Sequence, residues 1–215
     1  MTSSLVILGA GGHAAVLLDT LLEASNKIEA IVSPNPAANG QIFEGLSVYD
    51  TDDYILNSKV SDFKLINGVG SIPGSHTRVN LYRKFRALGF EFERVISPTA
   101  TISSYAVLGV GVQVMQGAII QAGAIIGENT IVNTGAIVEH DCVIGSHNHI
   151  APGVVLSGQV TTGDEVHIGT GACVIQCVSI GSGSVVGAGA AVTKDLQANV
   201  IAYGPKTTVV NPMDK

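Results

Sequence analysis

Aliphatic residues recur at every sixth position through the second half of the chain, and this period constrains the fold more than any other feature. Counting in sixes from residue 96 to residue 192 gives seventeen positions, and sixteen of them are aliphatic, with no insertion anywhere. These positions are Ile96, Ile102, Leu108, Val114, Ile120, Ile126, Val132, Val138, Ile144, Ile150, Leu156, Thr162, Ile168, Val174, Ile180, Val186 and Val192. A repeat this regular indicates an architecture in which each unit buries its apolar side chain against the next unit.

Small or β-branched residues usually stand four places after each aliphatic, and glycine often follows the aliphatic directly. Examples are Ala118, Ala124, Thr130, Ala136 and Cys142, and the pairs Ile126-Gly127, Ile144-Gly145 and Ile168-Gly169. The composition of 26 glycines, 46% hydrophobic and 13% charged residues is typical of a fold that uses small residues and glycine turns repetitively.

The first part of the chain follows a different pattern. Apolar runs at 4–8, 28–32 and 63–67 predict strands, and amphipathic periods at 12–24 and 76–88 predict helices, the second with Leu81, Phe85 and Leu88 on one face. We therefore expect an α/β domain over residues 1–92, a repeat domain over 93–194, and a tail over 195–215 that covers the far end of the repeats.

Charge and cysteine content exclude several classes of protein. A net charge of -6 with a pI near 5.4 argues against a general binder of nucleic acid or of anionic membranes. No run of 18 apolar residues and no signal-peptide pattern is present, so we expect a cytoplasmic protein without membrane insertion. Cys142, Cys173 and Cys177 form no CxxC pair, and we interpret them as small buried apolar residues.

Three of the six histidines lie in the stretch "IVEHDCVIGSHNHIAPG", residues 137–153. The six-residue period points Val138 and Ile144 inward, so His140 falls at a turn or on the outer face. His149 and His167 occupy the same place in hexads eighteen residues apart. If three hexads make one coil, these two imidazoles stack on adjacent coils. His147 is interpreted as a solvated residue.

Four segments, "VILGAGGHA", "VISPTATIS", "IVEHDCVIGSHNHIAPG" and "VGAGAAVTKD", occur in this order. Together they resemble the bacterial hexapeptide-repeat acyltransferases that act on nucleotide sugars, a group that includes bacillosamine-type N-acetyltransferases and sialic acid O-acetyltransferases. The resemblance implies an α/β Rossmann-like domain followed by a left-handed parallel β-helix of triangular coils. At three hexads a coil, residues 96–191 then make about five coils.

The same resemblance assigns the chemistry. His140 is expected to act as general base, a role that suits an imidazole with a pKa near 6.5, and Asp141 is expected to orient it. Glu139 stands on the other side and is able to do the same work. Acetyl-CoA is the implied acyl donor, with direct transfer and no metal. The implied cofactor-binding residues are His149, Gly158, His167, Thr170 and Ala188.

The nucleotide-linked sugar is assigned to the first domain. The loop "GAGGH" follows a strand and opens a helix, where free N–H groups attract phosphate, although the full dinucleotide fingerprint is missing because position 14 is alanine. The implied substrate-binding residues are Gly9, Gly11, Gly12, His13, Ser33, Asn35 and Gly68. Relatives that take UDP-sugars often carry two aspartates after the second strand. Here the chain has Ser33-Pro34-Asn35, which leaves the base open.

The expected activity is therefore acetyl transfer to the 4-amino group of a nucleotide-linked amino-deoxy sugar, of the UDP-4-amino-4,6-dideoxy type, for surface glycan or glycoprotein sugar synthesis. The family also implies a homotrimer with active sites between subunits, which residues 203–206 of the tail could reach. Three alternatives stay open: O-acetylation of sialic acid or another hydroxyl acceptor, a zinc hydrase that uses several of the histidines on the same fold, and a scaffold without catalysis.

Overall fold

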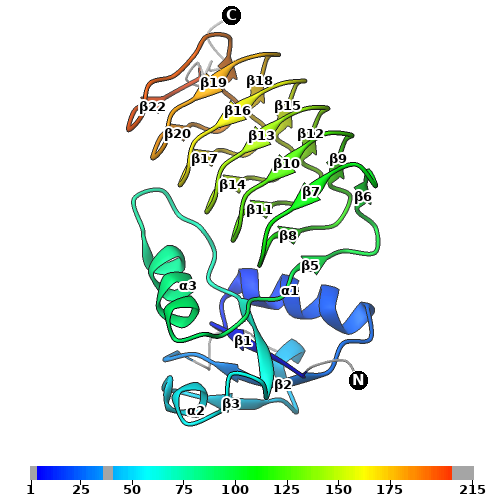
Figure 1. Ribbon diagram of the computed structural model, residues 1–215, viewed down its shortest axis with the longest axis vertical. Coiled ribbons are helices and arrows are strands. Elements are labelled where there is room, and N and C mark those ends of the chain that lie inside the picture. The colour runs from blue at the N-terminus through cyan, green and yellow to red at the C-terminus, as the bar shows by residue number, and fades with distance from the viewer. Residues whose placement is uncertain (1–3, 36–40, 205–215) are drawn as a thin grey trace, which may run out of the picture.

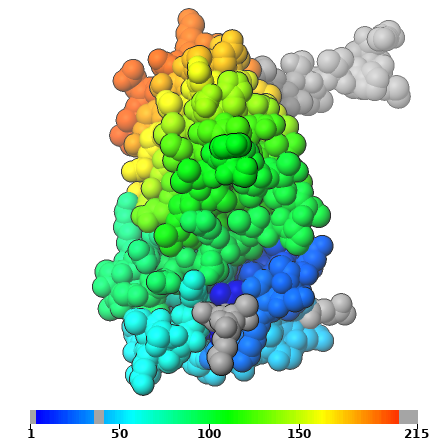
Figure 2. Space-filling model, turned by 45° about the vertical axis from the view of Figure 1, so that its right-hand side comes forward, coloured from blue at the N-terminus to red at the C-terminus, as the bar shows by residue number. Residues whose placement is uncertain are grey.

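The computed structural model describes residues 4–35 and 41–204. A small α/β domain stands at one end, and a β-helix rises from it (Figure 1). The space-filling view shows the β-helix, coloured green to orange, seated on the blue and cyan α/β domain (Figure 2). No helix within these described residues is long and apolar enough to cross a membrane.

The α/β domain is built on a parallel sheet of four strands in the order β3-β2-β1-β4. Its elements are β1 (Ser4–Leu8), α1 (Gly12–Glu23), β2 (Ile28–Val32), the 3₁₀ turn η1 (Gln41–Phe43), β3 (Ser47–Tyr49), α2 (Asp53–Leu56), β4 (Phe63–Asn67) and α3 (Thr77–Ala87). The three predicted strands and two predicted helices are present. The short elements β3 and α2 were not predicted, because three exposed strand residues and one helical turn leave no periodic signal.

The buried face of α3 differs from the predicted one. Phe85 is buried as expected, but Leu88 is half exposed at the helix end and Leu81 is only partly covered. The helix instead buries Val79, Tyr82 and the charged Arg78. Arg78 was not predicted on this face, because the helical period was read from apolar residues alone.

The β-helix is formed by eighteen two-residue strands in three parallel sheets of five, six and seven strands. In chain order they are β5 (Val95–Ile96), β6 (Thr101–Ile102), β7 (Val107–Leu108), β8 (Gln113–Val114), β9 (Ile119–Ile120), β10 (Ile125–Ile126), β11 (Ile131–Val132), β12 (Ile137–Val138), β13 (Val143–Ile144), β14 (His149–Ile150), β15 (Val155–Leu156), β16 (Thr161–Thr162), β17 (His167–Ile168), β18 (Cys173–Val174), β19 (Ser179–Ile180), β20 (Val185–Val186), β21 (Ala191–Val192) and β22 (Ile201–Ala202). From β5 to β21 each strand pairs with the strand eighteen residues away, as Val138 does with Leu156, whereas β22 pairs with β20 sixteen residues away. The expected left-handed β-helix is therefore confirmed, and its eighteen strands, three to a coil, make about six coils, against the five predicted.

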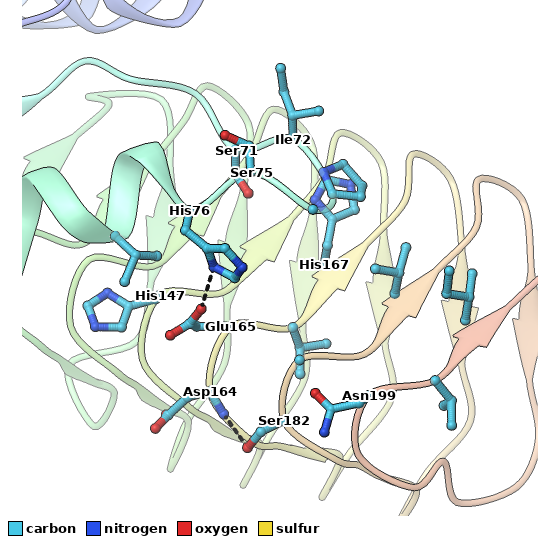
Figure 3. Close-up of a pocket in the computed structure, with 18 of the residues that line it drawn as sticks. Ser71, Ile72, Ser75, His76, His147, Asp164, Glu165, His167, Ser182 and Asn199 are labelled. Atoms are coloured by element: carbon cyan, nitrogen blue, oxygen red, sulfur yellow. Dashed lines mark hydrogen bonds and ion pairs between the residues drawn. The ribbon is translucent and has the colours of Figure 1, made fainter.

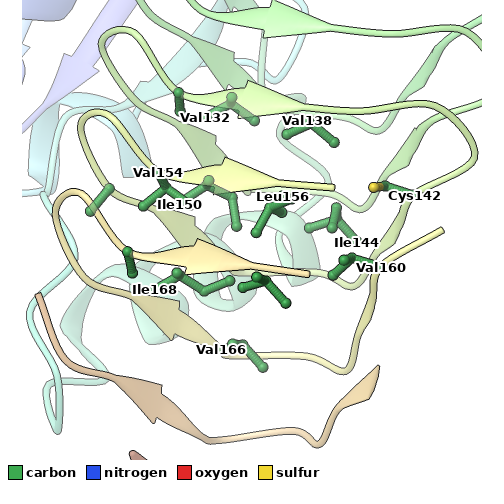
Figure 4. Packing of buried hydrophobic residues seen from close by; sticks show 14 of the residues in the cluster. Val132, Val138, Cys142, Ile144, Ile150, Val154, Leu156, Val160, Val166 and Ile168 are labelled. Carbon is green, nitrogen blue, oxygen red and sulfur yellow. The ribbon is translucent and has the colours of Figure 1, made fainter. Parts of the chain in front are cut away.

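The hexad aliphatics fill the interior of the β-helix, where they stack along each sheet (Figure 4). Ile96 is the clear exception, because it is 41% exposed, while its neighbour Val95 is buried against α1 together with Leu17 and Met115. The first coil has no coil beneath it, so its strand turns the other side chain toward the helix that covers this end. Ile102 and Leu108 are also only partly buried.

Thr162, the one polar residue among the hexad positions, lies in a buried hydrogen-bond ladder. The Nδ2 group of Asn148 donates to Thr162 Oγ1 at 2.6 Å and to the carbonyl of Gly163 at 2.9 Å. Thr130 on the preceding coil donates to the carbonyl of Gly145 at 3.0 Å. Because these buried polar groups are paired with one another, a threonine at position 162 is compatible with the core.

Every sixth residue from 111 to 189 has a positive φ, at the third position after the inward aliphatic. Eight of these corner positions are glycine, which adopts this conformation without strain. The other six are Asn129, Asp141, His147, Gln159, Glu165 and Cys177. A side chain in the left-handed region costs on the order of 1 kcal/mol. These six positions therefore carry side chains against the conformational preference of the corner.

The chain beyond the last complete coil lies along the upper end of the β-helix. Leu196 pairs with Ile180, and β22 pairs with β20. The described part of the predicted tail thus covers the end coil. Residues 205 and 206, which were expected near the active site, lie outside the described residues.

Candidate active site

His140 and Asp141 form a hydrogen-bonded pair at the corner between β12 and β13. Nδ1 of His140 lies 2.9 Å from Oδ2 of Asp141, and the two side chains are 59% and 57% exposed. Because an ionised carboxylate only accepts hydrogen bonds, Nδ1 carries the hydrogen and donates it. Nε2 of His140 then keeps the lone pair that a general base requires. Among the described residues, Glu139 makes no such bond to the imidazole.

Gly158 on the next coil lies directly against this imidazole. The N–H of Gln159 donates to the carbonyl of His140 at 2.9 Å, which stacks the two corners. A Cβ atom on Gly158 would lie 2.5 Å from Nε2 of His140, closer than any real contact. On the preceding coil, a Cβ atom on Gly123 would collide with Oδ1 of Asp141. Glycine above and below therefore leaves room for the pair.

His149 and His167 stack on adjacent strands, as the sequence predicted. Their ring centroids are 4.8 Å apart in an edge-to-face arrangement. Nδ2 of Asn133 lies 3.1 Å from Nε2 of His149, and Oδ1 of Asn133 accepts from the N–H of Thr134. Nε2 of His149 is therefore the acceptor and its hydrogen sits on Nδ1. The Nδ1 atoms of both histidines are buried, and neither makes a well-formed hydrogen bond within the described residues, although the backbone of Ser71 lies close enough to His149 to oppose the lowering of its pKa.

Burial lowers the pKa of both stacked histidines. The pKa of His149 falls to about 3, chiefly through burial and then through the neighbouring His167, His13 and Arg78. Burial also lowers the pKa of His167. Both imidazoles are therefore neutral at pH 7.

The expected cofactor-binding residues do not gather in one place within a single chain. Gly158 shares its corner with His140, whereas Thr170 and Ala188 lie exposed at the corner that follows β17 and β20. His149 and His167 lie on the sheet that ends at this second corner. One chain therefore holds the two halves of the expected site on different edges of its prism.

The expected nucleotide-binding residues lie at the carboxyl edge of the α/β sheet. Gly9 follows β1 and donates to the carbonyl of Val32 at 2.7 Å, and Ser33 and Asn35 follow β2. A Cβ atom on Gly11 or Gly12 would meet nothing within 4 Å. The first turn of α1 therefore faces open space, and its N–H groups have no partner within the helix.

Gly68 has a packing role in this structure. It follows β4 at the same edge, but a Cβ atom there would lie 2.7 Å from the carbonyl oxygen of Leu8 and 2.9 Å from Cβ of Ala14. The glycine lets the chain that follows β4 approach the end of β1 and the first turn of α1 closely. Its expected substrate contact would have to come from the main chain.

His13 faces the β-helix from the start of α1. Its Nε2 atom lies 2.8 Å from Oε1 of Gln113 on β8. The pKa of His13 falls to about 4, first through burial and second through the charge of Arg78, while the bond to Gln113 opposes the change. A contact between the two domains thus joins a residue of the glycine loop to the sheet that carries His149.

A cleft of about 900 Å³ lies between the loop of residues 71–76 and the β-helix (Figure 3). The loop leaves β4 and rises beside the coils before α3 begins (Figure 1). The residues that line the cleft include Ser71, Ile72, Ser75, His76, His147, Asp164, Glu165, His167, Ser182, Asn199 and Tyr203. Of these, only His167 and Tyr203 were expected near the site.

Glu165 holds the loop and α3 to the β-helix. Its carboxylate binds Nδ1 of His76 at 3.1 Å and the guanidinium of Arg83 at 2.8 Å. His76 points toward Glu165 across the cleft (Figure 3) and makes no side-chain cap for α3. The sequence offered one signal for Glu165, since it occupies a corner position where glycine is usual.

His147 is half-buried, which corrects its interpretation as a solvated residue. It accepts from Nδ2 of Asn129 at 3.0 Å and packs edge-on against Tyr82, with ring centroids 5.4 Å apart. Burial lowers its pKa, and the charge of Arg83 acts in the same direction. Position 147 is also a corner where glycine is usual.

Two of the three cysteines depart from expectation. Cys142 is buried, but Cys173 and Cys177 are exposed. Cys177 stands at a corner, and its thiol lies 3.2 Å from Oε1 of Gln159. In the part of the chain that the structure describes, no three histidine, cysteine or acidic side chains are placed to hold a metal ion.

Comparisons with known proteins match both domains. Residues 4–85 match the family model of the PglD N-terminal domain, and residues 123–158 match that of the bacterial transferase hexapeptide (six repeats). A search of curated protein sequences finds no match to the chain.

Solved structures resemble the whole chain. The acetyltransferase domain of PglB from Neisseria gonorrhoeae FA1090 is 34% identical, with a TM-score of 0.85 over 94% of this chain and 96% of that one. The same domain has been solved with acetyl coenzyme A, at 33% identity and a TM-score of 0.85 over 95% of this chain and 97% of that one. PerB from Caulobacter crescentus, solved with CoA and GDP-perosamine, is 36% identical, with a TM-score of 0.82 over 95% of each chain.

A parallel β-helix of hexapeptide repeats behind an α/β domain defines a class of acyltransferases. The sequence identity of 34% over 94% of the chain, shared with the PglB acetyltransferase domain, identifies one family within this class. The chain belongs to the hexapeptide-repeat acyltransferases with a PglD-type N-terminal domain.

Proposed function

We propose that the protein transfers the acetyl group of acetyl-CoA to the 4-amino group of a nucleotide-linked 4-amino-4,6-dideoxy sugar. The observation that carries this proposal is the exposed pair of His140 and Asp141, with Nε2 of His140 free to accept a proton. PerB, which resembles the whole chain, has been solved with CoA and GDP-perosamine. The open first turn of α1 offers N–H groups for the diphosphate.

In the proposed reaction, the sugar amine attacks the carbonyl carbon of the thioester. Nε2 of His140 takes a proton from the nitrogen as the C–N bond forms, and Asp141 stabilises the imidazolium. Main-chain N–H groups at the corners stabilise the developing oxyanion. The C–S bond then breaks, and the proton held by His140 passes to the sulfur of CoA. Amide and free thiol are the products.

A homotrimer would complete this site. In one chain, His140 and Gly158 lie at one corner of the prism, whereas Thr170 and Ala188 lie at another. A threefold arrangement brings the first corner of one copy against the second corner of its neighbour.

An exposed aliphatic column supports this assembly. It consists of Val107, Ile125 and Val143, which lie on the sheet of β7, β10 and β13.

The test is to mix the protein with acetyl-CoA and a panel of GDP-, UDP- and dTDP-linked 4-amino sugars, and to follow the release of free thiol. We expect turnover with one of them, and a loss of about 10²- to 10⁴-fold in His140→Asn. Wild-type activity in this variant would overturn the mechanism. Turnover only with hydroxyl acceptors would indicate an O-acetyltransferase. Bound metal in the purified protein, without thiol release from any acceptor, would favour the hydrase alternative.

A further inference from the structure

Arg78 on α3 is a fully buried guanidinium that makes no ion pair among the described residues. Its side chain donates to the carbonyls of Asn67 at 2.8 Å, Val69 at 2.7 Å and Asn129 at 3.3 Å. Burial lowers its pKa to about 9, so it is still charged at pH 7. Burying an unpaired charge is costly, and a residue that accepts this cost is a candidate for a role beyond packing.

The bonds from Arg78 reach both domains. Asn67 and Val69 belong to the end of β4 and the turn after it, whereas Asn129 is a corner of the β-helix. Nδ2 of Asn67 also donates back to the carbonyl of Arg78 at 3.0 Å and to Oδ1 of Asn129 at 3.2 Å. The arginine and two amides therefore form one connected network across the domain boundary.

This network determines which nitrogen of His13 carries the hydrogen. Nε2 of Gln113 donates to the carbonyl of Asn67 at 2.8 Å, the same carbonyl that Arg78 holds. A carbonyl only accepts, so the amide of Gln113 has one orientation, with Oε1 turned toward His13. Nε2 of His13 must then be the donor, and Nδ1 keeps its lone pair.

The same reasoning extends to His147. Oδ1 of Asn129 accepts from Asn67, so Nδ2 of Asn129 donates to Nδ1 of His147. His147 therefore carries its hydrogen on Nε2. Each imidazole is oriented by an amide that is anchored on Asn67, whose main-chain carbonyl Arg78 also binds. His147 lines the cleft beside the loop of residues 71–76.

We propose that Arg78 is a positioning residue for the acceptor, and that it sets the tautomer of His13 so that Nδ1 accepts a hydrogen bond from an uncharged hydroxyl of the sugar. The proposal rests on the proposed function. Nδ1 of His13 has no partner among the described residues, and it is not one of the unpartnered atoms closed off from solvent. A neutral nitrogen that only accepts suits a hydroxyl and not a phosphate oxygen. The phosphates are left to the N–H groups of the glycine loop.

The first experiment needs no substrate. Imidazole ¹⁵N NMR of the full chain, titrated with pH, reports the tautomer and the pKa of His13. We expect the Nε2–H form in the wild type, with a pKa well below 6.5. In Arg78→Met the pKa of His13 should rise, because the charge of Arg78 is the second cause that lowers it. Arg86→Met, an exposed arginine on the same helix, should leave the titration unchanged.

Gln113→Leu is the second variant. It keeps Arg78 in place but removes the acceptor for His13, so we expect a mixture of the two tautomers. This variant gives an answer even if Arg78→Met does not fold. A hydrogen on Nδ1 in the wild type, or an Arg78→Met spectrum identical to that of the wild type, would overturn the proposal.

The second experiment separates binding from chemistry. With the accepted nucleotide sugar, Arg78→Lys should raise KM for the sugar about tenfold, the effect of losing one well-placed buried hydrogen bond, and change kcat far less. Equal losses in kcat and kcat/KM would contradict a positioning role in sugar binding. If no nucleotide sugar is acetylated by the wild type, the proposed function fails, while the NMR result still tests the role of Arg78 on His13.

Discussion

His140 and Gly158 lie one coil apart at the same corner, and the imidazole of the first occupies the space that a side chain on the second would need. Gly158→Ala should therefore displace the imidazole without disturbing the core, since His140 is largely exposed and free to turn away. We expect the rate of acetyl transfer to fall about 10²-fold, as for other displacements of a catalytic group, with little change in the melting temperature. Kinetics together with thermal unfolding measure both effects.

Gly117→Asn is the matched control for this change. A Cβ atom there meets nothing within 4 Å, and asparagine tolerates the positive φ of the corner. An equal loss of rate in both variants would show that any corner substitution disturbs the enzyme.

Asp141 orients the imidazole through a single hydrogen bond of 2.9 Å. Asp141→Asn keeps the shape and tolerates the positive φ, but its amide has no negative charge to stabilise the imidazolium. We expect kcat to fall about 10²-fold or more. Glu139→Gln should have little effect in the same assay. The reverse outcome would make Glu139 the supporting carboxylate.

Two buried histidines make the folded state sensitive to acid. In the unfolded chain an imidazole takes up its proton near pH 6.5, but in the folded chain the pKa is about 4 for His13 and about 3 for His149. Between pH 6.5 and pH 4 the unfolded state therefore binds more protons than the folded state. The free energy of unfolding falls as the pH drops through this range. Above pH 6.5 this contribution is fully present.

Denaturant unfolding across this range measures the effect. His149→Asn removes one of the two groups, so its free energy of unfolding should depend less steeply on pH than that of the wild type. Identical slopes would mean that His149 is already protonated at mild pH in the folded protein.

The aliphatic column of Val107, Ile125 and Val143 is exposed in a single chain. If it lies between copies, Ile125→Lys places a charge in a buried contact, and the assembly should dissociate and lose activity. Val60→Lys is the control, because Val60 is exposed to a similar degree, 48% against 46%, but lies on the α/β domain. Sedimentation velocity distinguishes the two. A trimer that persists in Ile125→Lys would exclude this column from the interface.

Much of the fold was predictable because its signal is periodic. The six-residue period determines which residues point inward, and the alternation of strand and helix patterns located β1, α1, β2, β4 and α3. The period could not predict the ends. Ile96 turns outward because α1, a distant segment, covers the first coil and takes Val95 as its partner.

The candidate site was predictable only in part. The pairing of His140 with Asp141 and the stacking of His149 on His167 follow from local sequence and from the eighteen-residue coil. The cleft beside residues 71–76 and the bond from Arg78 to Asn129 depend on contacts between segments about fifty residues or more apart, for which hydrophobic patterns carry no signal. The non-glycine residues at corner positions did give a sequence signal for this region. They include Asn129, His147 and Glu165.

The corner that holds His140 and Asp141 belongs to a column in which Gly123, Asp141, Gln159 and Cys177 stand one above another at intervals of eighteen residues. Each coil contacts only the coils directly above and below it. A substitution two coils away from Asp141 can therefore change the surface beside the site while the contacts of His140 and Asp141 stay unchanged. In such a fold, ligand preference can evolve through changes in single coils, without any change in the residues that accept the proton.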